Sequence, residues 1–335
     1  MILLVSVGFG FGQLNNHPLF APLAAQVEHV AWEGTVFWDL IQPAFMFMVG
    51  VAMPFALARR VENGATFANN LRHVTIRSLK LIALSHLFTI VHESQFRLGF
   101  INVLSQIAFT YFFCFLLMQL AFRWQTVAAA LILGGHWAMF VLFAGPDGPF
   151  SPTQNVGTTI DMAVLGRTYP GNYVTINFIS STVTTLFGVW TGYLMASSRN
   201  LNEKLKILAG AAAACFAVGL ALSPVIPIVK RIWTASFTIY STGWVLLMLI
   251  GFVWLVEKKG YRKFTFPMVV VGANSIFAYV CFMLFRGSIT NAIGVVTGRF
   301  EWLGTMAPVA LATSTVLVIW YFCYWLYKRN IFIKV

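Results

Sequence analysis

Two ionisable residues near the start of an apolar segment could perform acid–base chemistry. His29 lies in a polar stretch, and Asp39 follows it inside the apolar segment Gly34–Leu57. A carboxylate beside a histidine orients the imidazole and supports its charged form, as a general base requires. Between them lie Trp32 and Trp38, aromatic residues of the kind enriched at membrane interfaces. The alternatives are that His29 is only solvated and that Asp39 caps a neighbouring helix near the outer interface.

Amide side chains form a second group of candidates. Asn102 and Gln106 are four residues apart, so one face of a helix would carry both. Asn274 and Ser275 give a later apolar segment a small, polar surface. Within a membrane such groups can line a ligand path or can join neighbouring helices, and the pattern leaves both roles open.

The remaining polar residues in apolar segments favour structural roles. We expect His86 and His136 to be packed and hydrogen-bonded. Arg77 and Lys80, three residues apart, favour anchoring by snorkelling at the membrane surface, with a phosphate contact as the alternative. The sequence has no glycine-rich phosphate loop, zinc signature or Gly-x-Ser-x-Gly motif, and it predicts no metal site.

Composition determines the class of protein that must position these residues. Of 335 residues, 59% are hydrophobic and 10% are charged, whereas a soluble domain has roughly 25% charged residues. The mean hydropathy is +0.79. The net charge of +12 would suit nucleic acid. The basic residues are spread over short loops, however, as in cytoplasmic membrane loops, so we expect no nucleic-acid partner. The four cysteines lie in apolar runs, which predicts buried, reduced thiols.

The sequence therefore predicts an all-α polytopic membrane protein with about ten transmembrane helices, because a span needs about 20 apolar residues. The expected spans are Met1–Gly12, Gly34–Leu57, Thr75–Val91, Phe100–Ala121, Thr126–Ala144, Val174–Met195, Leu205–Val229, Phe237–Val256, Pro267–Phe285 and Leu303–Tyr327. The first is too short, and we expect it to be the second half of a span whose start is missing or lies upstream. Residues 1–335 would form a single transmembrane domain.

Basic residues predict the orientation of these spans. Of the 22 lysines and arginines, six fall on one side of the expected membrane: Arg97, Arg167, Lys230, Arg231, Arg286 and Arg299. The other sixteen fall on the opposite side, which is therefore the cytoplasmic one. Both termini are then cytoplasmic, while the loops Gln13–Glu33 and Gly145–Gly171 face outward.

Several motifs, in order along nearly the whole chain, resemble a known family. They are His29-Val-Ala-Trp-Glu-Gly34, Trp38-Asp39-Leu-Ile-Gln-Pro43, Phe47-Met-Val-Gly50, Asn102-Val-Leu-Ser-Gln106, Trp233-Thr-Ala-Ser-Phe237, Gly272-Ala-Asn-Ser-Ile276 and the ending Tyr327-Lys-Arg-Asn-Ile-Phe-Ile-Lys334. The ordered set is similar to the transmembrane N-acetyltransferases typified by heparan-α-glucosaminide N-acetyltransferase and their bacterial relatives.

The resemblance implies an acyltransferase that moves acetyl from acetyl-CoA, its co-substrate, to an amino sugar or glycan outside the cytoplasm. In a bacterium it would lie in the inner membrane. The family's catalytic histidine corresponds to His29 and its membrane-embedded aspartate to Asp39. Asn102, Gln106, Asn274 and Ser275 would line the path of acetyl-CoA. Lipids and the acceptor would be its partners, with a homodimer or a larger membrane complex as further assemblies.

The chain also departs from the family pattern. The Ser-Leu-Asp-x-x-Arg-Gly element that opens bacterial members is absent, Gln106 stands where an arginine is expected, and Phe282 replaces a histidine of some relatives. One alternative is therefore a non-catalytic structural subunit of a membrane complex derived from this family. Another is a small-molecule transporter, because polar residues within spans also suit a substrate path.

Overall fold

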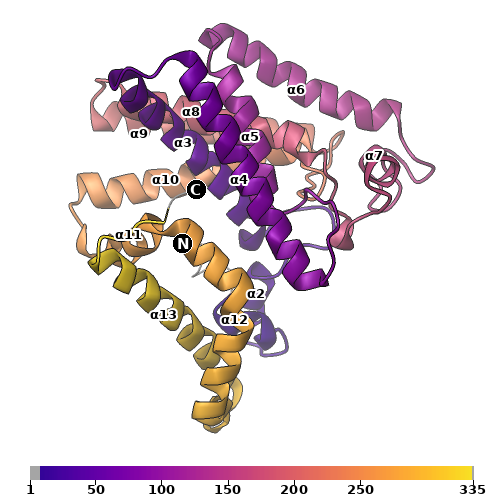
Figure 1. Cartoon of the computed structure of the whole chain (residues 1–335). Coiled ribbons are helices and arrows are strands. Elements are labelled where there is room, and N and C mark those ends of the chain that lie inside the picture. Colours follow the sequence, from indigo (N-terminus) through magenta and orange to yellow (C-terminus); the bar gives the residue numbers. More distant parts are fainter. Residues whose placement is uncertain (1–7, 334–335) are drawn as a thin grey trace. The chain divides into compact units, whose positions relative to one another are not determined.

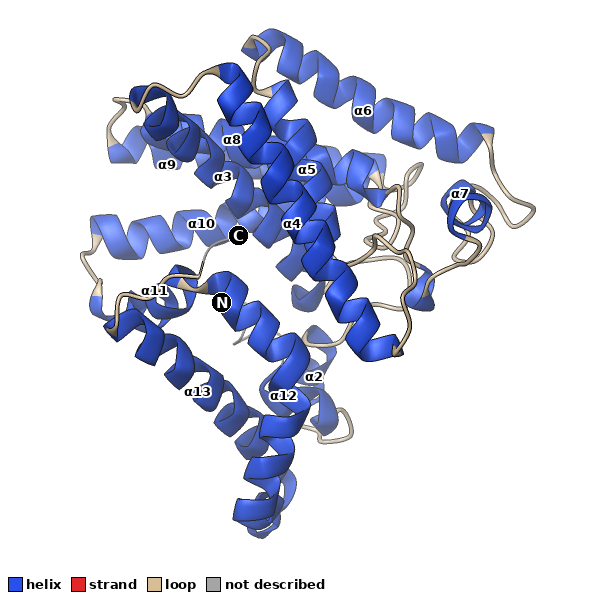
Figure 2. Ribbon diagram, viewed as in Figure 1, coloured by secondary structure: helices blue, strands red, loops and turns tan. Residues whose placement is uncertain are grey.

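The computed structural model describes residues 8–333, and every regular secondary-structure element within that range is a helix (Figure 2). The expected span Met1–Gly12 lies mostly outside the described residues. The helices, in chain order, are η1 (Gly8–Leu14), α2 (Ala21–Gln26), η2 (Phe37–Leu40), α3 (Ile41–Glu62), α4 (Phe67–Glu93), α5 (Val103–Leu117), α6 (Phe122–Leu142), α7 (Val156–Leu165), η3 (Pro170–Asn172), α8 (Asn177–Ala196), α9 (Leu201–Leu222), α10 (Ala235–Val253), η4 (Trp254–Lys258), η5 (Lys263–Thr265), α11 (Phe266–Ala273), α12 (Ser275–Thr297), η6 (Gly298–Met306) and α13 (Ala307–Lys328) (Figure 1).

Six segments among the described residues are long and apolar enough to cross a membrane. They are Phe37–Glu62, Phe67–Glu93, Phe122–Leu142, Leu201–Leu222, Ala235–Lys258 and Ser275–Lys328. The last contains both α12 and α13 within its 54 residues. Within residues 8–333 the structure is thus all-helical, with several helices that could span a membrane, as the composition predicted. The count of about ten spans and the cytoplasmic position of both termini stay predictions.

Contacts divide the chain into two compact units. The larger unit comprises Ala31–Thr35 and Gln42–Trp254. The smaller comprises Val36–Ile41, Leu255–Val335 and Met1–Val30, of which residues before 8 and after 333 are not described. The single transmembrane domain expected from the sequence stays a prediction.

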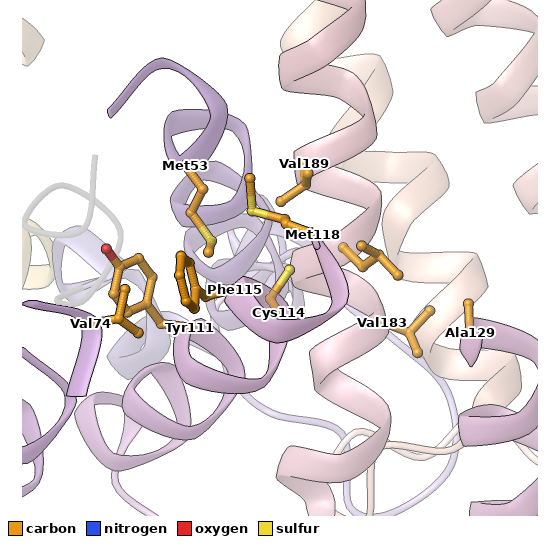
Figure 3. Packing of buried hydrophobic residues seen from close by; sticks show 10 residues of the cluster. Met53, Val74, Tyr111, Cys114, Phe115, Met118, Ala129, Val183 and Val189 are labelled. Atoms are coloured by element: carbon orange, nitrogen blue, oxygen red, sulfur yellow. The ribbon is translucent and has the colours of Figure 1, made fainter. Parts of the chain in front are cut away.

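In the larger unit α5 packs between α4 and α8, and α9 packs along α10. Apolar side chains of α3, α4, α5 and α8 form a core that includes Met53, Val74, Phe115 and Val183 (Figure 3). α3 and α8 cross with their backbones almost in contact: a Cβ at Gly50 would meet the carbonyl oxygen of Thr185. Small residues permit this approach, which is the usual device for packing helices in a membrane.

In the smaller unit α13 packs against η1, α11 and α12. Buried side chains of α11, α12 and α13 form its core, which includes Val270, Cys281 and Ile319. Gly10 has a positive φ of 75° and lies so close to α13 that a Cβ would meet the carbonyl oxygen of Pro308. A larger residue at position 10 would therefore push η1 away from α13.

Two expected elements differ in the structure. The expected span Pro267–Phe285 is divided at Asn274, whose non-helical backbone separates α11 from α12. The expected long loop Gly145–Gly171 contains α7, which begins with a capping box formed by Asn155 and Thr158. Both differences have a local cause. The backbone of Asn274 is outside helical geometry and therefore ends α11. The capping box of Asn155 and Thr158 favours the start of α7.

Candidate active site

His29 and Asp39, both in the smaller unit, are in direct contact. Nδ1 of His29 lies 2.7 Å from Oδ1 of Asp39. Asp39 is the third residue of η2, the single 3₁₀ turn that precedes α3. Its other oxygen, Oδ2, accepts the backbone N–H groups of Val36 (3.3 Å) and Val30 (3.4 Å). The carboxylate therefore joins the start of η2 to the segment that carries His29.

The two side chains differ sharply in exposure. The side chain of His29 is 40% exposed, whereas that of Asp39 is 2% exposed. A buried carboxylate needs several hydrogen bonds to replace lost hydration, and Asp39 receives them from the imidazole and two backbone N–H groups. When Nδ1–H donates to this carboxylate, Nε2 becomes the nitrogen that can accept a proton. The indole of Trp38 stands edge-on to the imidazole, with ring centroids 6.3 Å apart.

Gln106 belongs to a buried hydrogen-bond chain in the larger unit. Nε2 of Gln42 donates to Oε1 of Gln106, and Nε2 of Gln106 donates to Oγ of Ser181 at 2.9 Å. These residues lie on α3, α5 and α8, and all three side chains are buried. The chain therefore ties three helices together through groups that would be costly to leave unpaired.

Asn102 has a different role from Gln106, although the two are one helical turn apart. Asn102 is the N-cap of α5, and its Oδ1 accepts the N–H of Leu104 at 2.9 Å. An N-cap side chain satisfies one of the free N–H groups at the start of a helix. Asn102 thus defines where α5 begins and so places Gln106 in its first turns.

Asn274 fastens the C-terminal segment to the junction between α11 and α12. Its Nδ2 donates to the carbonyl of Ile331 at 3.0 Å, and its Oδ1 accepts the N–H of Ile333 at 2.9 Å. The side chain is fully buried. Ser275, the first residue of α12, is half-buried. The side chain of Asn274 therefore forms two hydrogen bonds with the backbone of a segment more than fifty residues later in the chain.

The six predicted site residues therefore fall into separate groups. His29 and Asp39 contact each other; Asn274 and Ser275 lie elsewhere in the same unit; Asn102 and Gln106 belong to the larger unit. Gln42 and Ser181, the direct partners of Gln106, were not predicted. Gln42 lies within the motif that carries Asp39, and Ser181 lies in a run of hydroxyl residues in an otherwise apolar segment. Those two signals could have identified them.

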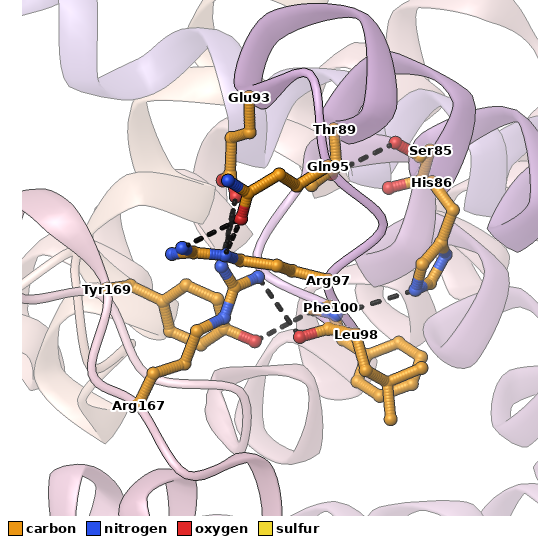
Figure 4. Close-up of polar contacts among 11 residues, drawn as sticks. Ser85, His86, Thr89, Glu93, Gln95, Arg97, Leu98, Phe100, Arg167 and Tyr169 are labelled. Atoms are coloured by element: carbon orange, nitrogen blue, oxygen red, sulfur yellow. Dashed lines mark hydrogen bonds and ion pairs between the residues drawn. The ribbon is translucent and has the colours of Figure 1, made fainter.

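His86 is part of a polar cluster that fastens the loop after α4 (Figure 4). Its Nδ1 donates to the carbonyl of Ile82 at 2.9 Å, and its Nε2 accepts the N–H of Gly99. In the same cluster Arg167 contacts Glu93 at 3.3 Å and donates to the carbonyl of Leu98 at 3.0 Å. Both ring nitrogens of His86 are engaged, which confirms the packed, hydrogen-bonded role expected for it.

His136 and the four cysteines lie within apolar helices. His136 is buried against Phe140, but its Nε2 has no hydrogen-bond partner, so the expected hydrogen bond at that atom is absent. Cys114, Cys281 and Cys323 are buried and free, as expected, and Cys215 is half-buried. Between residues 8 and 333, no three His, Cys, Asp or Glu side chains gather into a set that could hold a metal ion.

Sequence comparison relates the chain to characterised enzymes at low identity. It is 22% identical to heparan-alpha-glucosaminide N-acetyltransferase of Mus musculus over 350 aligned positions, which cover 84% of this chain. The Homo sapiens protein of the same name is 23% identical over the same share. The chain spans about half the length of these curated relatives, 51% and 50% respectively. No protein-family model matches. The chain is thus distantly similar to the heparan-α-glucosaminide N-acetyltransferases, which agrees with the resemblance of its motifs.

Proposed function

We propose that the chain is a transmembrane acyltransferase that moves acetyl from acetyl-CoA to an amino sugar or glycan outside the cytoplasm. The observation that carries the proposal is the 2.7 Å contact between His29 and Asp39. It supplies an oriented, accessible imidazole supported by a buried carboxylate, as a general base needs. The distant similarity to membrane N-acetyltransferases supports acetyl transfer as the reaction that this base would catalyse.

In this reaction the acceptor amine attacks the carbonyl carbon of the acetyl thioester. A C–N bond forms, the C–S bond to coenzyme A breaks, and Nε2 of His29 takes the proton from the amine. The departing thiolate then receives that proton, which restores neutral His29. Alternatively, Nε2 attacks the thioester first, so that an N–C bond forms, the C–S bond breaks and the coenzyme A thiolate leaves. The amine then attacks the acyl-imidazole, the N–C bond to His29 breaks, and the proton of the amine neutralises the thiolate. Asp39 has the same role in both routes, because it holds the ring through Nδ1.

The amide residues have a less direct place in the proposal. Asn102 caps a helix, Gln106 joins three helices, and Asn274 holds the C-terminal segment. Their predicted role, with Ser275, in lining a path for acetyl-CoA stays a prediction. The location in a bacterial inner membrane, the amino-sugar or glycan acceptor and any homodimer or complex are likewise parts of the proposal.

The proposal is tested with the purified chain reconstituted into liposomes. Radiolabelled acetyl-CoA and glucosamine are supplied, and acetylated glucosamine is measured over time against protein-free liposomes. A catalytically competent relative is assayed in parallel. We expect product to form in proportion to the protein. If the relative transfers acetyl while this chain transfers none to any amino sugar, the acyltransferase proposal is wrong, and the non-catalytic subunit becomes the better description.

A further inference from the structure

A small cavity lies among α3, α4 and α5 in the larger unit. It has a volume of about 50 Å³. On this measure one water molecule needs about 10–15 Å³, so the cavity has room for a small polyatomic group. Apolar side chains form one part of its lining: Met53, Ala56, Leu57, Val74, Phe115 and Met118. Polar side chains form the other part: Arg60, Asn70, His73, Arg77 and Tyr111.

The two arginines are held in place and retain donors for a further ligand. Nε of Arg60 donates to Oδ1 of Asn70 at 2.7 Å, and Asn70 is buried. The guanidinium of Arg77 lies over the ring of Tyr111, 4.8 Å from its centroid. Nε of Arg77 is buried without a hydrogen-bond partner. A guanidinium has five N–H donors, so each arginine keeps donors that its protein contacts do not use.

The cavity lacks a negative charge to balance these donors. Among the described residues that line it there is no aspartate or glutamate. Glu62, near Arg60 in the sequence, is exposed and is not one of the lining residues. A buried N–H group without an acceptor costs about 1–3 kcal/mol, and more when the group is charged. A bound anion would accept a hydrogen bond from Nε of Arg77 and so remove this cost. The same anion could also accept hydrogen bonds from Arg60, which lines the same cavity.

We propose that this cavity binds a single phosphate group through Arg60 and Arg77, with His73 beside it. Arginine forks match the oxygens of phosphate in geometry and charge. The phosphate comes either from the headgroup of an anionic phospholipid or from a soluble phosphate compound. A phospholipid headgroup suits a cavity that is partly lined by apolar side chains of membrane helices. A soluble phosphate compound suits the small volume of the cavity. The site uses none of the residues of the proposed acetyl transfer, so either proposal can fail alone.

The two sources are distinguished by two binding measurements on purified, delipidated protein in neutral detergent. In one, phosphatidylglycerol is titrated and retained lipid is counted by native mass spectrometry, with diacylglycerol as the phosphate-free control. In the other, binding of inorganic phosphate is measured by calorimetry. We expect one site per chain in at least one measurement, and no retention of diacylglycerol. Retention of diacylglycerol as strong as that of phosphatidylglycerol would overturn the lipid source.

Matched variants assign the binding to this cavity. Arg60→Gln and Arg77→Gln should each weaken binding about tenfold or more, because each removes a charge-assisted pair. Arg77→Lys keeps the charge but loses the forked guanidinium, so its affinity should lie between that of the unmodified protein and that of Arg77→Gln. Arg59→Gln and Arg72→Gln alter exposed neighbours that do not line the cavity and should change affinity less than about twofold. The proposal is wrong if the unmodified protein binds neither probe, or if the exposed variants lose as much affinity as the lining ones.

Discussion

The imidazole of His29 and the carboxylate of Asp39 meet at 2.7 Å, although ten residues separate them in the chain. One partner is accessible and the other is almost wholly buried. This division suits a pair in which the histidine meets the reactants and the aspartate holds it. An aspartate in that position also takes two backbone N–H groups, so it shapes the turn before α3 as well. Each residue should therefore give a different response to substitution.

His29→Ala should reduce acetyl transfer to glucosamine by about 10²-fold or more, the lower range for a positioned general base. Acetyl-CoA binding should change little, whereas thermal stability should fall, because the buried carboxylate of Asp39 loses the hydrogen bond from the imidazole. The measurement is the initial rate in liposomes. His17→Ala, another histidine in the same predicted outer loop, is the matched control. Equal activity of the His29 variant and the unmodified protein would exclude His29 as base or acyl carrier.

Asp39→Asn should cause a smaller loss of transfer than His29→Ala, because the imidazole remains but loses the carboxylate that orients it. The measurement is the initial rate of transfer in liposomes for both proteins. Some loss of stability is also expected, since Asp39 accepts two backbone N–H groups. Full activity of the Asp39 variant would mean that Asp39 only supports the turn.

Gln106→Leu should destabilise the fold by about 1–3 kcal/mol, because it leaves Gln42 and Ser181 with buried, unpaired polar groups. The measurement is denaturant or thermal unfolding of the detergent-solubilised protein. Gln119→Leu is the control, since the exposed Gln119 bonds only to a carbonyl one turn earlier in the chain. Adding Gln42→Leu to Gln106→Leu should cost less than the sum of the single changes. Equal stability of the Gln106 and Gln119 variants would contradict the buried chain.

Asp161→Asn should stabilise the protein relative to its parent more at neutral pH than in acid. Burial raises the pKa of Asp161 above its ordinary value of 3.8, and the hydrogen bonds from Thr175 only partly oppose this rise. The folded carboxyl thus holds its proton more tightly than the unfolded one. Its contribution to stability is therefore present below pH 3.8 and is lost as the pH rises through the raised pKa.

The check on Asp161 is the apparent melting temperature of each protein near pH 4 and near pH 7. Asp147→Asn, an exposed aspartate in the same predicted loop, corrects for general effects of lost charge. A melting-temperature difference that does not change with pH would show that Asp161 is ionised as easily in the fold as in the unfolded chain.

Labelling of single cysteines in intact cells tests the predicted orientation. In a background without the four natural cysteines, Asn15→Cys and Pro152→Cys should react with an impermeant thiol reagent. Lys259→Cys should react only after the membrane is opened. The reason is the unequal distribution of basic residues between the two sides. Reversed labelling would put His29 on the cytoplasmic side and remove the amino-sugar acceptor from its reach.

The helical membrane class follows from the sequence alone because it depends on composition. With 59% hydrophobic and 10% charged residues, the chain has too few polar side chains to cover a soluble surface, and helices satisfy their own backbone in lipid. The helix α9 (Leu201–Leu222) overlaps its expected span, Leu205–Val229, because a continuous apolar run specifies it. His29 and Asp39 could also be paired in advance, since both lie close together at the start of one apolar segment.

Contacts between distant parts of the chain were decided only by tertiary structure. Gln42 and Gln106 are 64 residues apart, and Gln106 and Ser181 are 75 apart, so no local pattern could join them. Asn274 looked like a polar residue within a span, but its partners are the backbone groups of Ile331 and Ile333. A buried amide takes whichever donors and acceptors the packing of helices brings to it. Residue type alone therefore predicts that such a group will be paired, while the fold determines its partner.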